Sequence, residues 1–280
     1  MEIGSKITSS FGTGYGTAGL FLQGTFFGHA CVAILTNSHV IGAERNARAK
    51  GAWLALNAVW TGLTPRLAPG PRKRALANAL WGMLPEFLGG TLPQNPSRQR
   101  LDPTAPDQSI FGNGGWFMTE LFGSISTESD GVVADVIYQP EIGSDFAVAP
   151  LRTGIAYDNM ARRAGAKHAI PKLADPQTTH DVYKFGATTL FTVGVVEQRT
   201  GNEFLVKGPQ SDFSDKGDSG SAVFDNDNAW IGLIYADAIG GVSGRISGGS
   251  KCIAQSHILS SLRSQHRDDI ALAPGSGKAP

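Results

Sequence analysis

The chain has 280 residues, a formal net charge of zero, 41% hydrophobic residues and 17% charged residues. This length suits one large domain or two small ones, and the apolar content is sufficient for a packed core. The composition argues against global disorder, and the neutral charge balance gives no support for binding to nucleic acid or to an anionic membrane. The 36 glycines and many short apolar runs favour short strands joined by turns.

The first strands are expected between residues 17 and 41. One apolar run covers residues 20–22, and the segment ACVAILT at 30–36 is rich in residues that favour sheets. The first residues do not show a basic stretch followed by an apolar run, so we expect no signal peptide and a cytoplasmic location. No apolar run approaches the length of a membrane span.

Residues 43–115 differ in character from the segments around them. Between residues 44 and 100 there are nine Lys or Arg against two Glu, and the apolar residues of 72–88 predict a helix that Pro85 disturbs. A solvated basic face is the simplest interpretation. The segment could also be an insertion that binds a regulatory partner or inhibits the protein. A nucleic-acid patch is the third option, but its tryptophans are better explained as packing groups.

Strand character returns after this segment and continues to residue 237. A helix is expected at 256–265, and residues 271–280 are expected to form a disordered tail. The predicted strands are 131–139, 145–151, one or more within 181–200, 203–208, 221–225 and 229–237.

The sequence gives no sign of a cofactor or metal site. Cys31 and Cys252 lie in apolar surroundings, which favours two buried free thiols over a disulfide, and two cysteines do not form a zinc site. The glycine-rich run at 239–250 does not precede a helix with a phosphate-binding lysine, so we interpret it as the rim of a pocket rather than a nucleotide loop.

The segment Gly217-Asp218-Ser219-Gly220-Ser221 is the strongest candidate for a reactive site. A serine hydroxyl becomes a nucleophile only beside a base that an acid orients, and the oxyanion that develops needs fixed hydrogen-bond donors. Glycine permits a tight turn in which neighbouring amides point into one concavity. The amides of Gly217 and Ser219 could bind an oxyanion in this way.

His39 is the candidate base because it follows a β-rich run at the switch from strand to loop. Asp145 is the candidate acid because it precedes an alternating apolar run, where the start of a strand could hold it near the core. A carboxylate that accepts the imidazole N–H fixes the tautomer of the histidine. Asp135, within the segment VVADVIY, is the second choice for the acid.

The segments LTNSHVIG, SDFAVAPL and KGDSGSAVF resemble the signature motifs of trypsin-like, chymotrypsin-fold serine proteases, in the order His, Asp, Ser. GTAGLFL and VYKFGATTLFTVGVV also resemble strands of divergent members of that family. The resemblance implies an all-β fold of two six-stranded antiparallel barrels. The first would lie within residues 1–150, with the basic, partly helical insertion, and the second within 151–270, with the terminal helix.

The resemblance also implies a serine endopeptidase that cleaves proteins or peptides through an acyl-enzyme. His39, Asp145 and Ser219 would be its triad. The segment Ile234-Tyr235-Ala236 would pair with the substrate backbone, and Phe213 and Ser214 would lie at the floor of the specificity pocket. The alternative is a protease-like binding module that is silent or needs a partner for activation.

The motif does not by itself specify the partner of Asp218 or the substrate preference. Asp218 corresponds to the acid that pairs with a new N-terminus in digestive proteases. Because an unpaired buried charge is costly, we predict that it pairs with a cation or donors of this chain. The specificity is also open: Asp212, Asp215 or Asp237 would favour a basic substrate side chain, and Phe213 a small or apolar one.

Overall fold

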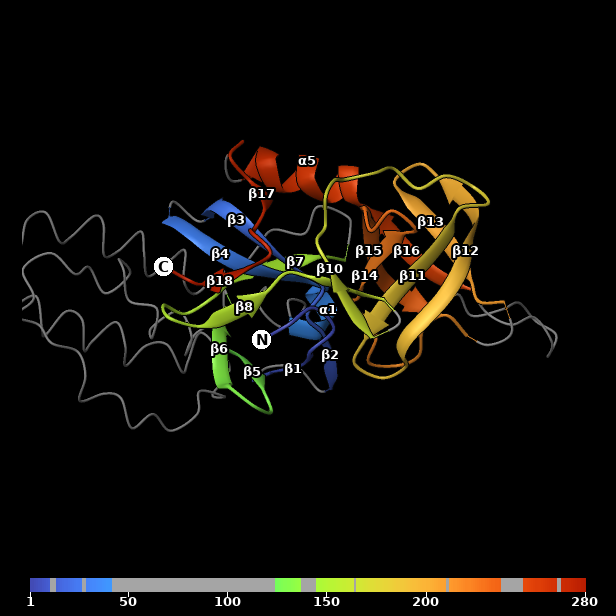
Figure 1. The fold of residues 1–280 in the computed structure, drawn as a ribbon. Coiled ribbons are helices and arrows are strands. Elements are labelled where there is room, and N and C mark those ends of the chain that lie inside the picture. Colours follow the sequence, from blue (N-terminus) through green and yellow to red (C-terminus); the bar gives the residue numbers. More distant parts are fainter. Residues whose placement is uncertain are drawn as a thin grey trace, which may run out of the picture.

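The computed structural model describes residues 1–10, 14–26, 29–41, 124–136, 145–163, 165–209, 212–237, 249–265 and 268–280. Strands dominate these residues, and the two halves lie side by side (Figure 1). The basic segment 43–115 and its predicted helix lie outside the described residues.

The first half contains two four-stranded sheets, in the orders β2-β1-β5-β6 and β17-β3-β4-β7. A bridge between Ala134 and Leu151 joins them. The strands of this half are β1 (Lys6–Ser9), β2 (Tyr15–Thr17), β3 (Leu20–Phe26), β4 (His29–Thr36), β5 (Ser124–Thr127), β6 (Gly131–Asp135), β7 (Ala147–Pro150) and β17 (Ala271–Leu272). A second closed barrel, expected here from the resemblance, remains a prediction.

The second half is a closed antiparallel barrel of six strands, in the order β11-β12-β13-β16-β15-β14. Its interior packs residues that alternate with outward-facing ones, as the strand period of two requires. Its strands are β11 (Asp181–Gly186), β12 (Leu190–Thr200), β13 (Glu203–Lys207), β14 (Ala222–Asp225), β15 (Trp230–Asp237) and β16 (Ser250–Ala254). This barrel confirms one of the two expected from the sequence.

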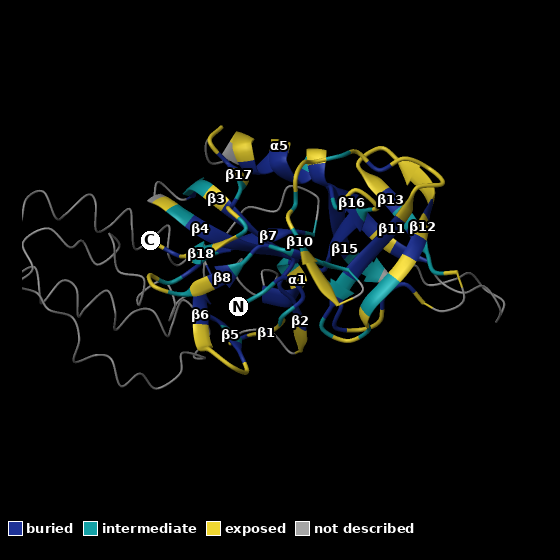
Figure 2. Ribbon diagram, viewed as in Figure 1, coloured by how far each residue is buried: buried dark blue, intermediate teal, exposed yellow. Residues whose placement is uncertain are grey.

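Short elements connect and cover the two halves. The helix α5 (Gln255–Gln265) follows β16 directly, as predicted, and packs on β15 and β16. Buried residues run without a break from β4 and β7 to the helix and the barrel (Figure 2). The remaining elements are α1 (Ser38–Ile41), β8 (Ala156–Asp158), β9 (Ala161–Arg163), β10 (Ala166–His168) and β18 (Ser276–Lys278).

The C-terminal residues differ from the expected disordered tail. After α5 the chain returns to the first half, where β17 pairs with β3 and β18 pairs with β8. Asn159, which is 2% exposed, joins these segments because its amide group bonds to both backbone groups of Phe21 and to the carbonyl of Ala273. Backbone pairing does not depend on side-chain identity, which explains how a segment rich in Gly and Pro is ordered.

Candidate active site

The pairing of β4 with β7 brings the His39 and Asp145 segments together. Thr36, the last residue of β4, lies opposite Ala147, the first of β7, so the residues just beyond these ends are neighbours. The side-chain amide of Asn37 donates to the carbonyl of Asp145 over 2.5 Å. The hydroxyl of Ser38 donates to the carbonyl of Phe146 over 2.7 Å. These bonds hold the one-turn helix α1, which carries His39, against the residue expected to orient it.

The carboxylate of Asp145 contacts His39 twice. Its Oδ1 accepts the backbone N–H of His39 over 3.0 Å, and its Oδ2 is hydrogen-bonded to the ring Nδ1. Since Nδ1 then carries the proton toward the acid, Nε2 is left as the basic nitrogen of the neutral ring. Asp135, the second choice for the acid, instead forms an ion pair with Arg152 at 2.9 Å.

The Ser219 loop comes from the second half and contacts the first. The backbone N–H of Thr17 donates to the carbonyl of Ser219 over 2.9 Å. A Cβ on Gly16 would lie 2.5 Å from a methyl carbon of Val40 and 3.0 Å from the carbonyl oxygen of Ser219. Val40, which follows His39, and the carbonyl of Ser219 therefore both pack against Gly16. Only glycine allows this close approach of the histidine turn and the serine loop.

The amides of residues 215–221 show a selective pattern of hydrogen bonding. Five of the seven donate to acceptors in the protein, at distances of 2.6–3.1 Å. Within the described residues, the amides of Gly217 and Ser219 do not donate to any acceptor. Gly217 has a φ of 101° and Gly220 a φ of 93°, values in the left-handed region that glycine favours. The two open amides are those that the sequence suggested for an oxyanion.

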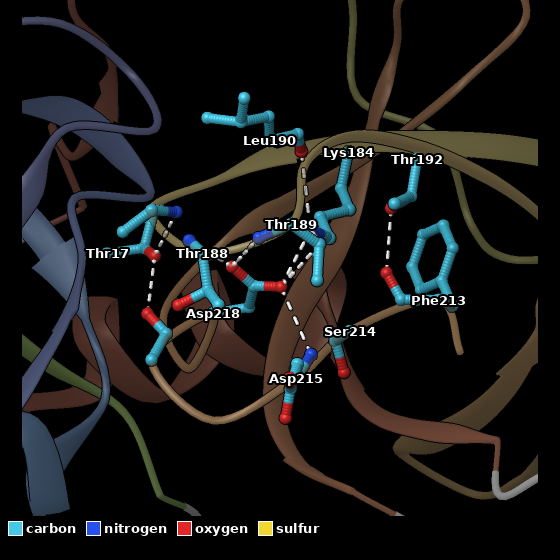
Figure 3. A network of polar contacts seen from close by, with 12 residues as sticks. Thr17, Lys184, Thr188, Thr189, Leu190, Thr192, Phe213, Ser214, Asp215 and Asp218 are labelled. Carbon is cyan, nitrogen blue, oxygen red and sulfur yellow. Dashed lines mark hydrogen bonds and ion pairs between the residues drawn. The ribbon is translucent and has the colours of Figure 1, made fainter. Parts of the chain in front are cut away.

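Asp218 is completely buried and has a partner from the chain itself, as predicted. The ammonium of Lys184, also completely buried, donates to its Oδ2 over 2.8 Å. The hydroxyl of Thr189 and the amide of Asp215 also donate to Oδ2, and the amides of Thr188 and Thr189 donate to Oδ1 (Figure 3). The carboxylate thus ties β11 and the turn after it to the loop that carries Ser219.

The Lys184–Asp218 pair is ionised. Burial opposes the charge on Asp218, but the bonds from Lys184 and Thr189 outweigh it and hold the pKa of Asp218 below its usual value. Burial lowers the pKa of Lys184, while the carboxylate counteracts that effect. The ammonium also donates to the hydroxyl of Thr189 and, over 3.3 Å, to the carbonyl of Leu190. Three acceptors match the three protons of a charged lysine.

The proposed substrate-binding residues divide into buried and accessible ones. Phe213 is 0% exposed and packs inside the closed barrel, so its side chain belongs to the core rather than to a pocket surface. Ser214 is buried and shares a hydrogen bond of 2.6 Å with the hydroxyl of Ser250. Ile234 is also buried, and its backbone groups bond to Gly220 and Ser221.

Tyr235 and Ala236 are half-buried, and they lie where β15 extends beyond its pairing with β14. The pairing of β15 with β16 shifts register between Ile234 and Ala236, so Tyr235 is the extra residue of a β-bulge. Burial raises the pKa of Tyr235 to about 12, with added contributions from the negative charges of Glu203 and Asp145. The phenol is therefore neutral near the candidate acid.

Comparisons with known proteins address the fold. The chain matches no protein-family model, and no curated protein is similar to it in sequence. Solved structures do match. A serine protease specific for glutamic acid, said to use a histidine triad in substrate binding, is 15% identical with a TM-score of 0.51, over 93% of this chain and 97% of that chain. Protease A of Thermobifida fusca is 12% identical with a TM-score of 0.51, over 98% of this chain and 100% of that chain.

A Nocardiopsis protease is 12% identical with a TM-score of 0.50, over 97% of this chain and 99% of that chain. The three proteins are chymotrypsin-like serine proteases. The chain has a chymotrypsin-like fold. This likeness confirms the chymotrypsin-like fold that the motifs implied, whereas the second closed barrel stays a prediction. At such low identity it concerns the fold and not the reaction.

Sequence reasoning missed two residues that this chymotrypsin-like fold places near Ser219. Lys184 was not singled out, although a charged residue inside the apolar strand segment DVYKFG was a signal that it needs a buried partner. Tyr15, on β2, contacts the backbone of Gly217 and gave no signal, because the contact joins residues about 200 positions apart.

Among the residues that the structure describes, no group of His, Cys, Asp and Glu could hold a metal ion. In the same part of the chain, no helix is long and apolar enough to cross a bilayer.

Cys31 and Cys252 are both free thiols. Cys252 is buried as expected, whereas Cys31 is half-buried, and burial raises the pKa of both.

Proposed function

We propose that this protein is a serine endopeptidase with Ser219 as nucleophile, His39 as general base and acid, and Asp145 as the orienting carboxylate. The observation that carries the proposal is the pair of open amides at Gly217 and Ser219, in a loop whose other amides are bonded. A structural turn would gain stability by pairing them as well. Backbone N–H donors left free beside a serine hydroxyl are suited to form hydrogen bonds with an oxyanion.

The proposed reaction uses these groups in sequence. The hydroxyl of Ser219 attacks the peptide carbonyl carbon while its proton moves to Nε2 of His39. The carbonyl oxygen becomes an oxyanion that accepts hydrogen bonds from the amides of Gly217 and Ser219. The tetrahedral intermediate collapses, the C–N bond breaks, and His39 gives its proton to the departing amine. A water molecule, deprotonated by His39, then hydrolyses the acyl ester and regenerates Ser219.

The substrate backbone would add a strand to the accessible edge of β15. Ile234 already uses both backbone groups in bonds to Gly220 and Ser221, so substrate pairing would begin at Tyr235 and continue along Ala236. This arrangement would place the residues before the cleaved bond along β15. Protein or peptide is the substrate class that such pairing favours, because the recognised groups are those of the main chain.

Labelling with a fluorophosphonate tests the proposal on the full chain. The unmodified protein should be labelled covalently, and Ser219→Ala should abolish the label. Ser221→Ala is the matched control, since this neighbouring serine is completely buried and should not react. Labelling that persists in Ser219→Ala would refute the assignment of the nucleophile.

A regulatory partner at residues 43–115 is a separate part of the proposal. If the chain is labelled only after limited proteolysis within this segment, the protein is a protease that needs activation. If it is labelled neither before nor after proteolysis, while the folded state is intact by circular dichroism, the binding-module alternative replaces the endopeptidase.

A further inference from the structure

An aromatic side chain of the first half covers the oxyanion side of the candidate active site. A Cβ on Gly217 would lie 2.2 Å from Cε2 and 2.8 Å from Cζ of Tyr15, so the ring packs directly on this backbone. Its hydroxyl lies 3.3 Å from Oγ1 of Thr188, which donates its own proton to the carbonyl of Lys216 over 2.9 Å. Tyr15 is therefore the donor, and its ring is fixed while 38% exposed.

One exposed lysine contacts this ring, and another exposed lysine precedes the glycine on which the ring packs. The ammonium of Lys6 lies 4.4 Å from the centroid of Tyr15, within the range of a cation–π contact. Lys216 immediately precedes Gly217 in the chain. Within the described residues, neither ammonium takes part in an ion pair. The ring contact holds the Lys6 ammonium beside the candidate reaction centre, and Lys216 adds a second positive charge next to Gly217 in the chain.

The acidic groups nearby do not cancel the charge of both lysines. The carboxylate of Asp218 is neutralised by Lys184 in the interior. Asp215 is exposed, and its Oδ1 accepts the backbone N–H of Lys216 over 2.6 Å. Among the described residues next to Tyr15 and Gly217, two ammonium groups thus stand against the one exposed carboxylate of Asp215.

The position of this surface relative to Ser219 indicates which part of a substrate it would meet. The serine loop has two flanks. On one, Gly220 and Ser221 bond to Ile234 of β15, the strand proposed to hold the residues before the cleaved bond. On the other, Gly217 lies under Tyr15 of β2. A peptide that enters along β15 and crosses Ser219 leaves past Tyr15, so the amine product lies here.

We propose, on the basis of the proposed endopeptidase function, that Lys6, Tyr15 and Lys216 form a subsite that selects acidic residues just after the cleaved bond. The ring of Tyr15 packs against the substrate chain, and the two ammonium groups attract an Asp or Glu side chain. Exposed ion pairs are weak, so each lysine should change the preference by about two- to fivefold. The preference should fall at about 1 M salt, where the Debye length is about 3 Å.

Acyl transfer tests this subsite separately from the rest of the site. The acyl-enzyme is formed from one peptide ester, chosen by a library screen, and is then intercepted by an added dipeptide amide instead of water. The amine nitrogen forms the new amide bond, the ester bond to Ser219 breaks, and the proton returns to the serine oxygen. The ratio of captured to hydrolysed product measures binding on the leaving side alone, because the acyl group is constant.

The probes are aspartyl-alaninamide, lysyl-alaninamide and alanyl-alaninamide. The aspartyl probe should be captured best and the lysyl probe least. Lys6→Glu and Lys216→Glu should each reverse part of this order, and Lys6→Gln should weaken it if Lys6→Glu does not fold. Lys278→Glu, an equal charge change on β18, is the matched control and should retain the native order, because β18 pairs with β8 in a different sheet from β1 and β2.

The two proposals fail in different ways. Equal capture of the three probes by a protein that hydrolyses the ester would overturn the subsite and leave the endopeptidase intact. An unchanged order in both Lys6→Glu and Lys216→Glu would also overturn it. Failure to hydrolyse any ester, together with no fluorophosphonate label, would reject the endopeptidase and the subsite with it.

Discussion

Replacing Lys184 with methionine is the most direct test of how the serine loop is held. Both side chains of the Lys184–Asp218 pair are 0% exposed, so the substitution leaves a carboxylate in the interior without its cation. Removing one partner of a buried ion pair costs about 3–5 kcal/mol. For a chain of this size that corresponds to a decrease in Tm of about 10 °C. Fluorophosphonate labelling should slow as well, because Asp218 lies between the two open amides.

The pH dependence of unfolding provides a second test, because the stabilities of the native protein and of Lys184→Met should change with pH in opposite directions. In the native protein the pKa of Asp218 is held below its usual value of 3.8, so its contribution to stability is present above that pH. The contribution is lost as the pH falls through the lower pKa of the folded state. In Lys184→Met only the hydrogen bonds from Thr188, Thr189 and Asp215 still oppose burial, so we expect the pKa of Asp218 to rise above 3.8. The variant should therefore lose stability as the pH rises, the opposite direction.

Urea unfolding of both proteins between about pH 4 and pH 8 measures this difference, since each unit of pKa change is worth about 1.4 kcal/mol. The double variant Lys184→Met with Asp218→Asn is the control, because a neutral amide avoids the unpaired charge and should recover about half of the loss. The reasoning is refuted if Lys184→Met follows the native pH profile or if the double variant is no more stable than the single one.

Three further results are expected. Asp145→Asn should lower the rate of hydrolysis about ten-thousandfold in steady-state assays through loss of the tautomer, whereas Asp135→Asn should affect mainly stability; equal rate losses would contradict the triad. Gly186→Ala should reduce the unfolding free energy by about 1–3 kcal/mol in urea unfolding, since its Cβ would lie 2.4 Å from a carboxylate oxygen of Asp218. Gly14→Ala should change it little, since no atom of the described residues lies within 4 Å of the added Cβ. Deleting residues 271–280 should lower the Tm by several degrees in a thermal scan, and an unchanged Tm would contradict the strand pairing seen there.

The three candidate motifs could be recognised from the sequence because each is local. The residues around His39, Asp145 and Ser219 have short sequence patterns, and their order along the chain limited the folds that were compatible. The barrel strands were predicted where apolar residues alternate or cluster, as in residues 181–200. These features depend on neighbours within a few positions, so the sequence alone contains the information.

Contacts between distant segments could not be predicted in the same way. The need of Asp218 for a partner followed from the cost of burying a charge, but its identity as Lys184 required the pairing of β11 with β14. Phe213 was assigned to the pocket from its place before the motif, yet the structure turns it into the barrel. Side-chain direction in such a loop depends on backbone geometry that no local pattern specifies.

The order of residues 271–280 was also missed, for a different reason. Gly, Pro and Ala give this segment little side-chain preference for a sheet. Its stability comes from backbone groups of β3 and β8 that would otherwise lack partners, and from the amide of Asn159. Composition indicates the structure that a segment favours in isolation, whereas pairing with β3 and β8 determines the structure of this segment.

The pairing of β17 and β18 with strands of the first half affects how the protein folds during its synthesis. Strand β3 is synthesised early, but β17, its neighbour in the sheet, follows about 250 residues later. At a translation rate of about 5–20 residues per second, the edge of the first sheet stays open for at least ten seconds or so. Until residues 271–278 emerge from the ribosome, this half cannot complete its hydrogen bonding. The nascent chain would therefore finish assembling this half only after residues 271–278 have been translated.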